Sequence, residues 1–197
     1  DYGLLDENGQ LVENPVHYRD EGHAGEAERF TASIMSREEL FSRTGVQLID
    51  FNTLFQLTAQ KRLAPETLAR AHHLLHIGDL VACLLGGRPA SELTIASTSQ
   101  LLGSSERSWD LDLVQKAGLP AGIFGELVEP GTVTGEIQPG IARQAGLTAP
   151  CPIIAAASHD TASAVASCPA TEPGGWAYLS SGTWSLLGIE TTAPVLG

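Results

Sequence analysis

The stretch Ile153-Ile154-Ala155-Ala156-Ala157-Ser158-His159-Asp160-Thr161-Ala162 combines an apolar run with a polar segment that contains a carboxylate. Its apolar run predicts a short buried strand, and the small residues from Ala162 to Ser167 predict a helix. Asp160 then lies at the carboxyl end of a strand and near the start of a helix, where open α/β sheets place ligands. Because aspartate is also a common helix N-cap, a purely structural role stays open on the pattern alone.

A second polar turn follows in the segment from Trp176 to Ile189, which predicts two strands joined by a Ser-Gly-Thr turn. In Ser180-Ser181-Gly182-Thr183 the glycine permits a tight turn, and successive amides and hydroxyls could cradle phosphate oxygens. An ordinary hairpin turn is an equally good interpretation. A carboxylate and a phosphate-binding turn are both parts that a phosphoryl transferase needs.

Upstream of residue 149, the first half of the sequence predicts a hairpin and a capped helix. The Asn8-Gly9 pair between short apolar runs indicates a hairpin at the edge of a sheet. Ser36 and Glu39 match a capping box, and Gly45 ends the helix that the box begins.

The following block is expected to be mostly helical. Apolar positions recur at helical spacing over 51–85, with breaks near Pro65 and Gly78, and predict two or three helices. A further helix is expected over 110–116, and Gly135 is expected in a turn.

Composition excludes several classes of protein. A net charge of −12 with only 11 Lys and Arg argues against nucleic-acid binding. No apolar run reaches the ~20 residues that span a bilayer, so no membrane partner is expected. Three scattered cysteines predict free thiols rather than disulfides. These features predict a soluble, cytoplasmic protein.

Two long segments carry a resemblance to a known family. Ser158-His159-Asp160-Thr161-Ala162-Ser163-Ala164-Val165 and Tyr178-Leu179-Ser180-Ser181-Gly182-Thr183-Trp184-Ser185-Leu186 resemble the rhamnulokinase signature of the FGGY carbohydrate kinases. Further segments match in the same order, among them Ala96-Ser97-Thr98-Ser99-Gln100 and Val128-Glu129-Pro130-Gly131-Thr132. The resemblance covers nearly the whole chain.

This resemblance implies a partial α/β fold of the actin-like, ribonuclease H-like ATPase type. Residues 1–148 would belong to the N-terminal lobe, without its first phosphate loop, and 149–197 to the start of the C-terminal lobe. The chain would then be an internal piece of a longer kinase and inactive by itself. Its oligomeric state stays open.

The resemblance also implies a reaction and its residues. L-rhamnulose would be phosphorylated on O1 with ATP and Mg²⁺, and Asp160 would be the general base. His159, Asp160 and Thr161 would bind the sugar, while Gly182 and Thr183 would contact the ATP phosphates. No protein-bound metal is expected. The alternatives are an FGGY kinase for another ketose or deoxy sugar, and a non-catalytic sugar-binding relative.

Two other groups of residues contain the side-chain types of known sites. His72, His73 and His76 include an i, i+4 pair, but without nearby cysteines a solvated helix face is preferred to a zinc site. Ser158, His159 and Asp160 contain the residue types of a hydrolase triad, yet adjacent residues of a strand point in alternating directions and cannot form that relay.

Overall fold

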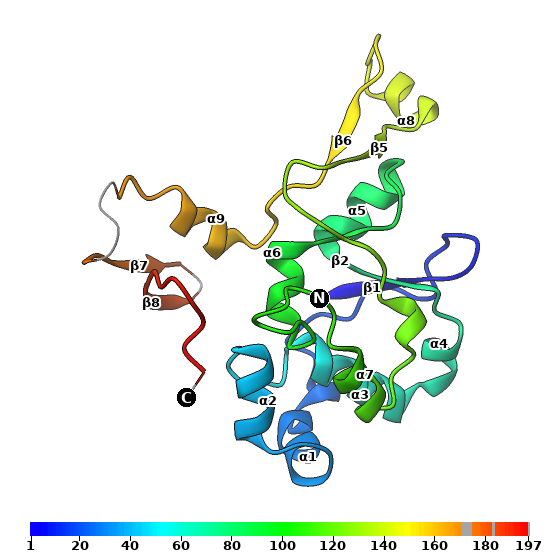
Figure 1. The fold of residues 1–197 in the computed structure, drawn as a ribbon. Helices are drawn as coiled ribbons and strands as arrows, with labels where there is room; N and C mark the ends of the chain where they lie inside the picture. The colour runs from blue at the N-terminus through cyan, green and yellow to red at the C-terminus, as the bar shows by residue number, and fades with distance from the viewer. Residues whose placement is uncertain (171–174, 183, 197) are drawn as a thin grey trace.

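A computed structural model describes residues 1–170, 175–182 and 184–196, and Figure 1 shows their arrangement. The elements are β1 (Tyr2–Leu5), η1 (Glu21–His23), α1 (Glu26–Ser33), α2 (Arg37–Thr44), α3 (Thr53–Leu63), α4 (Pro65–Ala69), β2 (His73–His76), α5 (Ile77–Leu85), β3 (Ser91–Glu92), α6 (Leu93–Ala96), η2 (Ser97–Ser99), α7 (Leu111–Lys116), η3 (Ala121–Ile123), β4 (Leu127–Val128), β5 (Val133–Glu136), α8 (Pro139–Gln144), β6 (Pro152–Ile154), α9 (Asp160–Ala166), β7 (Ala177–Ser181) and β8 (Ser185–Ile189).

The main core lies among the helices of the first 125 residues. Phe30 of α1 and Phe55 of α3 meet edge to face with ring centroids 5.7 Å apart, an arrangement that aromatic pairs prefer. Leu113 of α7 is also fully buried in this cluster. In Figure 1, α9 and the β7–β8 hairpin lie to one side of this helical body, and β5, β6 and α8 project from another.

Local signals placed α2 correctly. The Ser36 hydroxyl accepts a hydrogen bond from the Glu39 amide at 3.2 Å, as the capping box predicts. Gly45 ends the helix with φ of 68°, a left-handed conformation that glycine adopts without steric cost. Helix α7 and the β7–β8 hairpin are likewise confirmed.

Three helices, α3, α4 and α5, lie within 51–85 as predicted, but the break expected near Gly78 comes earlier and contains a strand, since Gly78 itself belongs to α5. Residues His73–His76 form β2, which pairs antiparallel with β1 from Tyr2↔His76 to Leu5↔His73. The turn at Asn8-Gly9 is present, since the Gly9 amide donates to the Asp6 carbonyl at 3.0 Å. The segment after the turn pairs with β1 through the bridge Leu5↔Leu11, and the Val12 amide donates to the Leu4 carbonyl at 2.9 Å. Strand β2 depends on a partner about seventy residues earlier, which no local pattern reveals.

Gly135 lies inside β5 and not in the predicted turn. A Cβ at this position would stand 2.6 Å from the Gly86 carbonyl oxygen and 2.9 Å from the Gly87 Cα. Glycine is therefore required by the close approach of two backbones. Strand β6, paired with β5, buries Ile153 but leaves Ile154 52% exposed, so the strand predicted to be buried is covered on one face.

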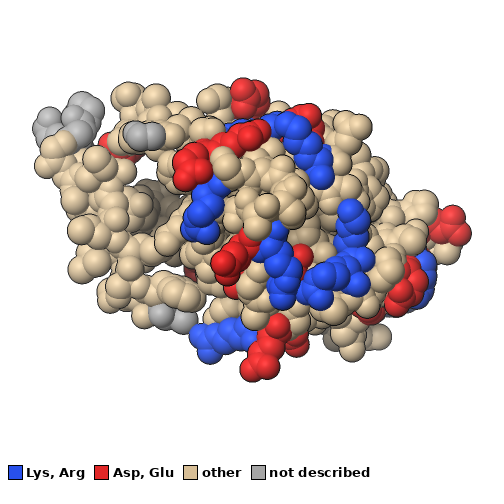
Figure 2. Space-filling view, turned by 90° about the horizontal axis from the view of Figure 1, so that it is seen from below, with Lys and Arg blue, Asp and Glu red and all other residues tan. Residues whose placement is uncertain are grey.

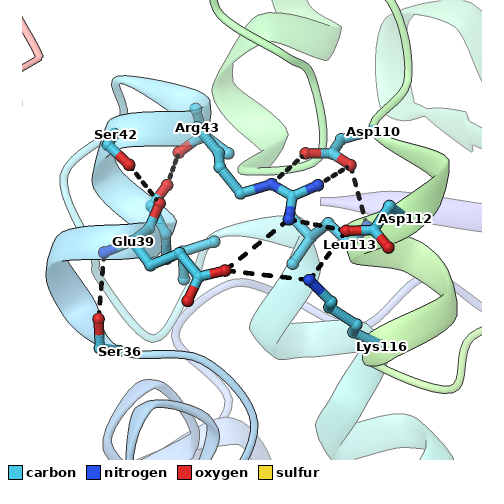
Figure 3. A network of polar contacts seen from close by, with 10 residues as sticks. Ser36, Glu39, Ser42, Arg43, Asp110, Asp112, Leu113 and Lys116 are labelled. Atoms are coloured by element: carbon cyan, nitrogen blue, oxygen red, sulfur yellow. Dashed lines mark hydrogen bonds and ion pairs between the residues drawn. The ribbon is translucent and has the colours of Figure 1, made fainter.

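Arg43 ties α2 to α7 (Figure 3). Its guanidinium donates from Nε to Asp110 Oδ2 and from Nη2 to Asp110 Oδ1, both at 2.7 Å, and from Nη1 to Asp112 Oδ2 at 2.8 Å. The hydrogen bonds to Asp110 raise the pKa of the Arg43 guanidinium further above its usual value. Lys116 also lies 3.0 Å from Asp112.

The surface is mixed in charge. On the face shown in Figure 2, Lys and Arg side chains lie interspersed with Asp and Glu. Within the described residues, no helix is both long and apolar enough to cross a bilayer. The cysteines Cys83, Cys151 and Cys168 are free thiols.

Substitution Arg43→Lys should lower the free energy of unfolding by about 1–3 kcal/mol, because an ammonium cannot reproduce the paired contacts to Asp110. Equilibrium urea unfolding of the complete protein measures this change. Arg37→Lys, at an exposed position of the same helix, is the control and should shift stability by less than about 0.5 kcal/mol. Equal effects of the two substitutions would contradict the structural role of Arg43.

Substitution Gly135→Ala should destabilise the protein by about 1–3 kcal/mol, since the new methyl group meets backbone atoms that cannot move aside cheaply. Thermal unfolding of the complete protein tests this. Gly140→Ala is the matched control, because nothing lies within 4 Å of an added Cβ in α8. The control should be neutral or slightly stabilising.

Candidate active site

Asp160 is the first residue of α9, and His159 precedes it at the N-cap position without a side-chain cap bond. The Asp160 side chain is exposed, and its Oδ1 accepts a hydrogen bond from the Thr161 amide at 2.7 Å. Asp160 is therefore not the N-cap that the structural interpretation required. The order of strand, aspartate and helix is as predicted, with residues 155–159 between β6 and α9.

The loop before Asp160 is held by Glu92, which lies at the start of α6 and is fully buried. Glu92 Oε2 accepts hydrogen bonds from the Ser158 amide at 3.2 Å and from the Ser158 hydroxyl at 3.4 Å. The same carboxylate caps α6 through the amides of Thr94 and Ile95. One buried anion thus joins the helical body to the candidate catalytic loop.

Thr94 adds a second link to this loop. Its hydroxyl donates to Glu92 Oε2 at 2.5 Å and accepts a hydrogen bond from the His159 amide at 3.3 Å. A Cβ on Gly78 of α5 would stand 3.1 Å from the Ser158 Cβ, so α5 also packs closely against this segment. The two residues before Asp160 are therefore fixed by their backbones.

Asp79 lies behind Glu92. Its buried Oδ2 accepts a hydrogen bond from the Glu92 amide at 3.1 Å. Burial, reinforced by the negative charge of Glu92, raises the pKa of the Asp79 carboxyl to about 6. Two buried carboxyl groups therefore support the segment that presents Asp160.

The predicted phosphate turn connects β7 to β8. The Gly182 amide donates to the Trp184 carbonyl at 2.9 Å, and among the described residues nothing would lie within 4 Å of a Cβ added to Gly182. The hydroxyls of Ser181 and Ser185 lie 3.3 Å apart. Thr183, the predicted phosphate contact, lies outside the described residues. Helix α9 contacts β7, so Asp160 and this turn belong to neighbouring elements.

Aromatic side chains connect this turn to the helical body. The ring centroid of Trp184 lies 5.7 Å from that of Phe51, and Phe51 lies 5.7 Å from Tyr18 in an edge-to-face arrangement. A separate cavity of about 160 Å³ lies beside β1 and α3, lined by Tyr2, Gln60 and neighbouring residues. None of the predicted site residues that the structure describes lines that cavity.

The histidine prediction is corrected. His73 and His76 lie on β2 and not on a solvated helix face, and His76 is 2% exposed. Burial lowers the pKa of the His76 imidazole to about 3, and its Nε2 lies 3.3 Å from the Thr53 hydroxyl. Among residues 1–170, 175–182 and 184–196, no group of three or more His, Cys, Asp or Glu side chains could hold a metal.

Sequence reasoning missed Glu92, Thr94 and Asp79. The only local signal is that Glu92 directly precedes a short helix, which indicates a cap and no more. The hydrogen bond from Ser158 to Glu92 spans 66 residues and that from His159 to Thr94 spans 65, so both exist only in the folded chain.

The mixed α/β fold and the position of Asp160, which follows a strand and begins a helix, agree with one family of proteins. The model of the FGGY family of carbohydrate kinases, N-terminal domain, matches residues 1–166, and the chain belongs to this family. The structure of a carbohydrate kinase from Novosphingobium aromaticivorans matches with a TM-score of 0.77 and 27% identity, over 98% of this chain and 41% of that chain. The predicted α/β, actin-like fold class is confirmed.

Within the family, two similar curated relatives are both rhamnulokinases. The chain is 41% identical over its whole length to a rhamnulokinase from Bacteroides thetaiotaomicron, of which it covers 40%. It is 42% identical, over 98% of its length, to a rhamnulokinase from Pectobacterium atrosepticum, of which it covers 38%. The chain thus spans about 40% of the length of these relatives.

The raised pKa of Asp79 has a consequence for stability. Its value of about 6 in the folded protein exceeds the usual 3.8, so the folded state holds the proton more tightly between these two values. The contribution of Asp79 to stability should therefore be largest below about pH 4 and should fall as pH rises to about 6. Asp79→Asn, which keeps an acceptor for the Glu92 amide, removes this dependence.

The measurement is the difference in unfolding free energy between the native protein and Asp79→Asn, from urea titrations at pH 4.5 to 7. This difference should shift against the native protein by about 1–2 kcal/mol as pH rises. A difference that does not change with pH would show that Asp79 titrates like a solvated carboxyl group.

Proposed function

We propose that the complete protein is an ATP-dependent sugar kinase that phosphorylates L-rhamnulose on O1, with Asp160 as the general base. The observation that carries the proposal is the 41% identity over the whole chain to a protein named rhamnulokinase. The location of Asp160, exposed at the start of α9 and directly after an anchored loop, supports its role.

Asp160 has the chemistry that this step needs. Among the described residues, its hydrogen bonds involve Oδ1 alone, which leaves Oδ2 to receive a proton. The alcohol of a sugar has a pKa far above 7, so the carboxylate accepts the proton as the oxygen–phosphorus bond forms. Position therefore matters more than basicity.

His159 and Thr161 flank Asp160 and are proposed to contact the sugar, while Gly182 and Thr183 are proposed to contact the phosphates. ATP supplies the phosphoryl group that is transferred. The open space beside Gly182 is compatible with the approach of a phosphate. Mg²⁺ is proposed to arrive with the nucleotide, since the described residues offer no cluster for it, and no step is assigned to it.

Three further points stay predictions: the division into lobes near residue 149, a cytoplasmic location, and the lack of nucleic-acid or membrane partners. A strand pairing crosses the predicted division, since β6 pairs with β5.

The deciding experiment is Asp160→Asn in the complete protein. Turnover of L-rhamnulose with ATP is measured by a coupled assay of ADP release. It should fall by about 10²–10⁴-fold because proton acceptance is lost. Calorimetric affinity for the sugar should change less than about fivefold, since the amide keeps the shape of the carboxylate.

Glu38→Gln, which neutralises an exposed carboxylate on α2, is the control and should keep full turnover. Full activity of Asp160→Asn would remove the general base from the proposal. Turnover of other ketoses or deoxy sugars, but not of L-rhamnulose, would correct the substrate while leaving the kinase reaction in place.

A further inference from the structure

We propose that Glu92 is a positioning residue for Asp160, acting through its hydrogen bonds to Ser158 and, by way of the Thr94 hydroxyl, to His159. The inference rests on the proposed function. It goes beyond that function because Glu92 lies in a different part of the chain and is not proposed to contact the substrates itself.

The hydrogen bonds of Glu92 are more numerous than capping requires. Three donors come from its own helix, namely the Thr94 amide at 2.7 Å, the Thr94 hydroxyl at 2.5 Å and the Ile95 amide at 3.3 Å. Two more come from Ser158. A fully buried anion needs such donors. Because two of them belong to Ser158, the burial of Glu92 also holds the loop before Asp160 in place.

Thr94 extends the same control by one residue. Because its hydroxyl proton points to Glu92 Oε2, its oxygen is oriented to accept from the His159 amide at 3.3 Å. The backbones of Ser158 and His159 are thus fixed in sequence, directly before Asp160. A displacement of about 1 Å in a reacting group can cost roughly 10²-fold in rate, so this anchor bears on turnover.

The geometry separates capping from anchoring. Aspartate is a strong N-cap residue, so Glu92→Asp should keep the bonds to Thr94 and Ile95 that begin α6. Its side chain is one methylene shorter and should lose the reach to Ser158, which belongs to another segment. Charge and capping are retained, and the anchor alone is lost.

The test is steady-state kinetics of Glu92→Asp in the complete protein. The value of kcat should fall by about 10–100-fold, while KM for ATP should change less than about threefold. Glu38→Asp, at an exposed position of α2, is the matched control and should leave both constants unchanged. Unchanged kcat in folded Glu92→Asp would overturn the inference.

A matched pair at Thr94 tests the same link through a smaller change. Thr94→Val removes the hydroxyl and should lower kcat by about tenfold. Thr94→Ser keeps the hydroxyl, and its kcat should stay within about twofold of the native value. Equal activity of the two variants would contradict the relay. This pair also decides the matter if Glu92→Asp does not fold.

A double variant separates this inference from the general-base proposal. If Glu92 acts through Asp160, adding Glu92→Asp to Asp160→Asn should not lower the residual turnover further. Both substitutions then remove the same contribution, proton acceptance by a correctly placed Asp160. Multiplicative losses would show that Glu92 acts elsewhere. Inactive Asp160→Asn with fully active Glu92→Asp rejects the positioning role alone, whereas active Asp160→Asn rejects the proposed function itself.

Discussion

A carboxylate without access to water must be satisfied by donors of the protein, and Glu92 is such a group. Its partners come from α6 and from the loop before α9. The relative placement of the helical body and the Asp160 segment therefore follows from one requirement. Asp79 also constrains Glu92, because its carboxyl group accepts a hydrogen bond from the Glu92 backbone amide.

This arrangement suits the chemistry of phosphoryl transfer, in which the protein contributes mainly position and electrostatic stabilisation. Asp160, the proposed general base, begins α9, so its position depends on how the residues directly before it are held. Here the constraint comes from backbone amides of Ser158 and His159, which leaves the side chain of Asp160 available. Leu93 and Ala96 of α6 form a separate cluster with Leu102, and Trp109 packs against both this cluster and the main core.

Local patterns predicted local structure well. The capping box at Ser36, the left-handed glycine at Gly45 and the β7–β8 hairpin depend on residues within a few positions of one another, and each was confirmed. Errors occurred where distant segments decide. The run around His76 has apolar residues that fit a helix, yet pairing with β1 makes it a strand, and Gly135 is set by contact with Gly86.

The family and the order of strand, Asp160 and helix could be read from the sequence alone, because contiguous residues carry both. The sequence could not reveal Glu92, Thr94 and Asp79 as a support for that residue. Hydrogen bonds across 65 and 66 residues leave no periodicity and no spacing rule. These contacts form only in the folded chain, because a buried charge takes hydrogen-bond partners that are close in space, whatever their position along the chain.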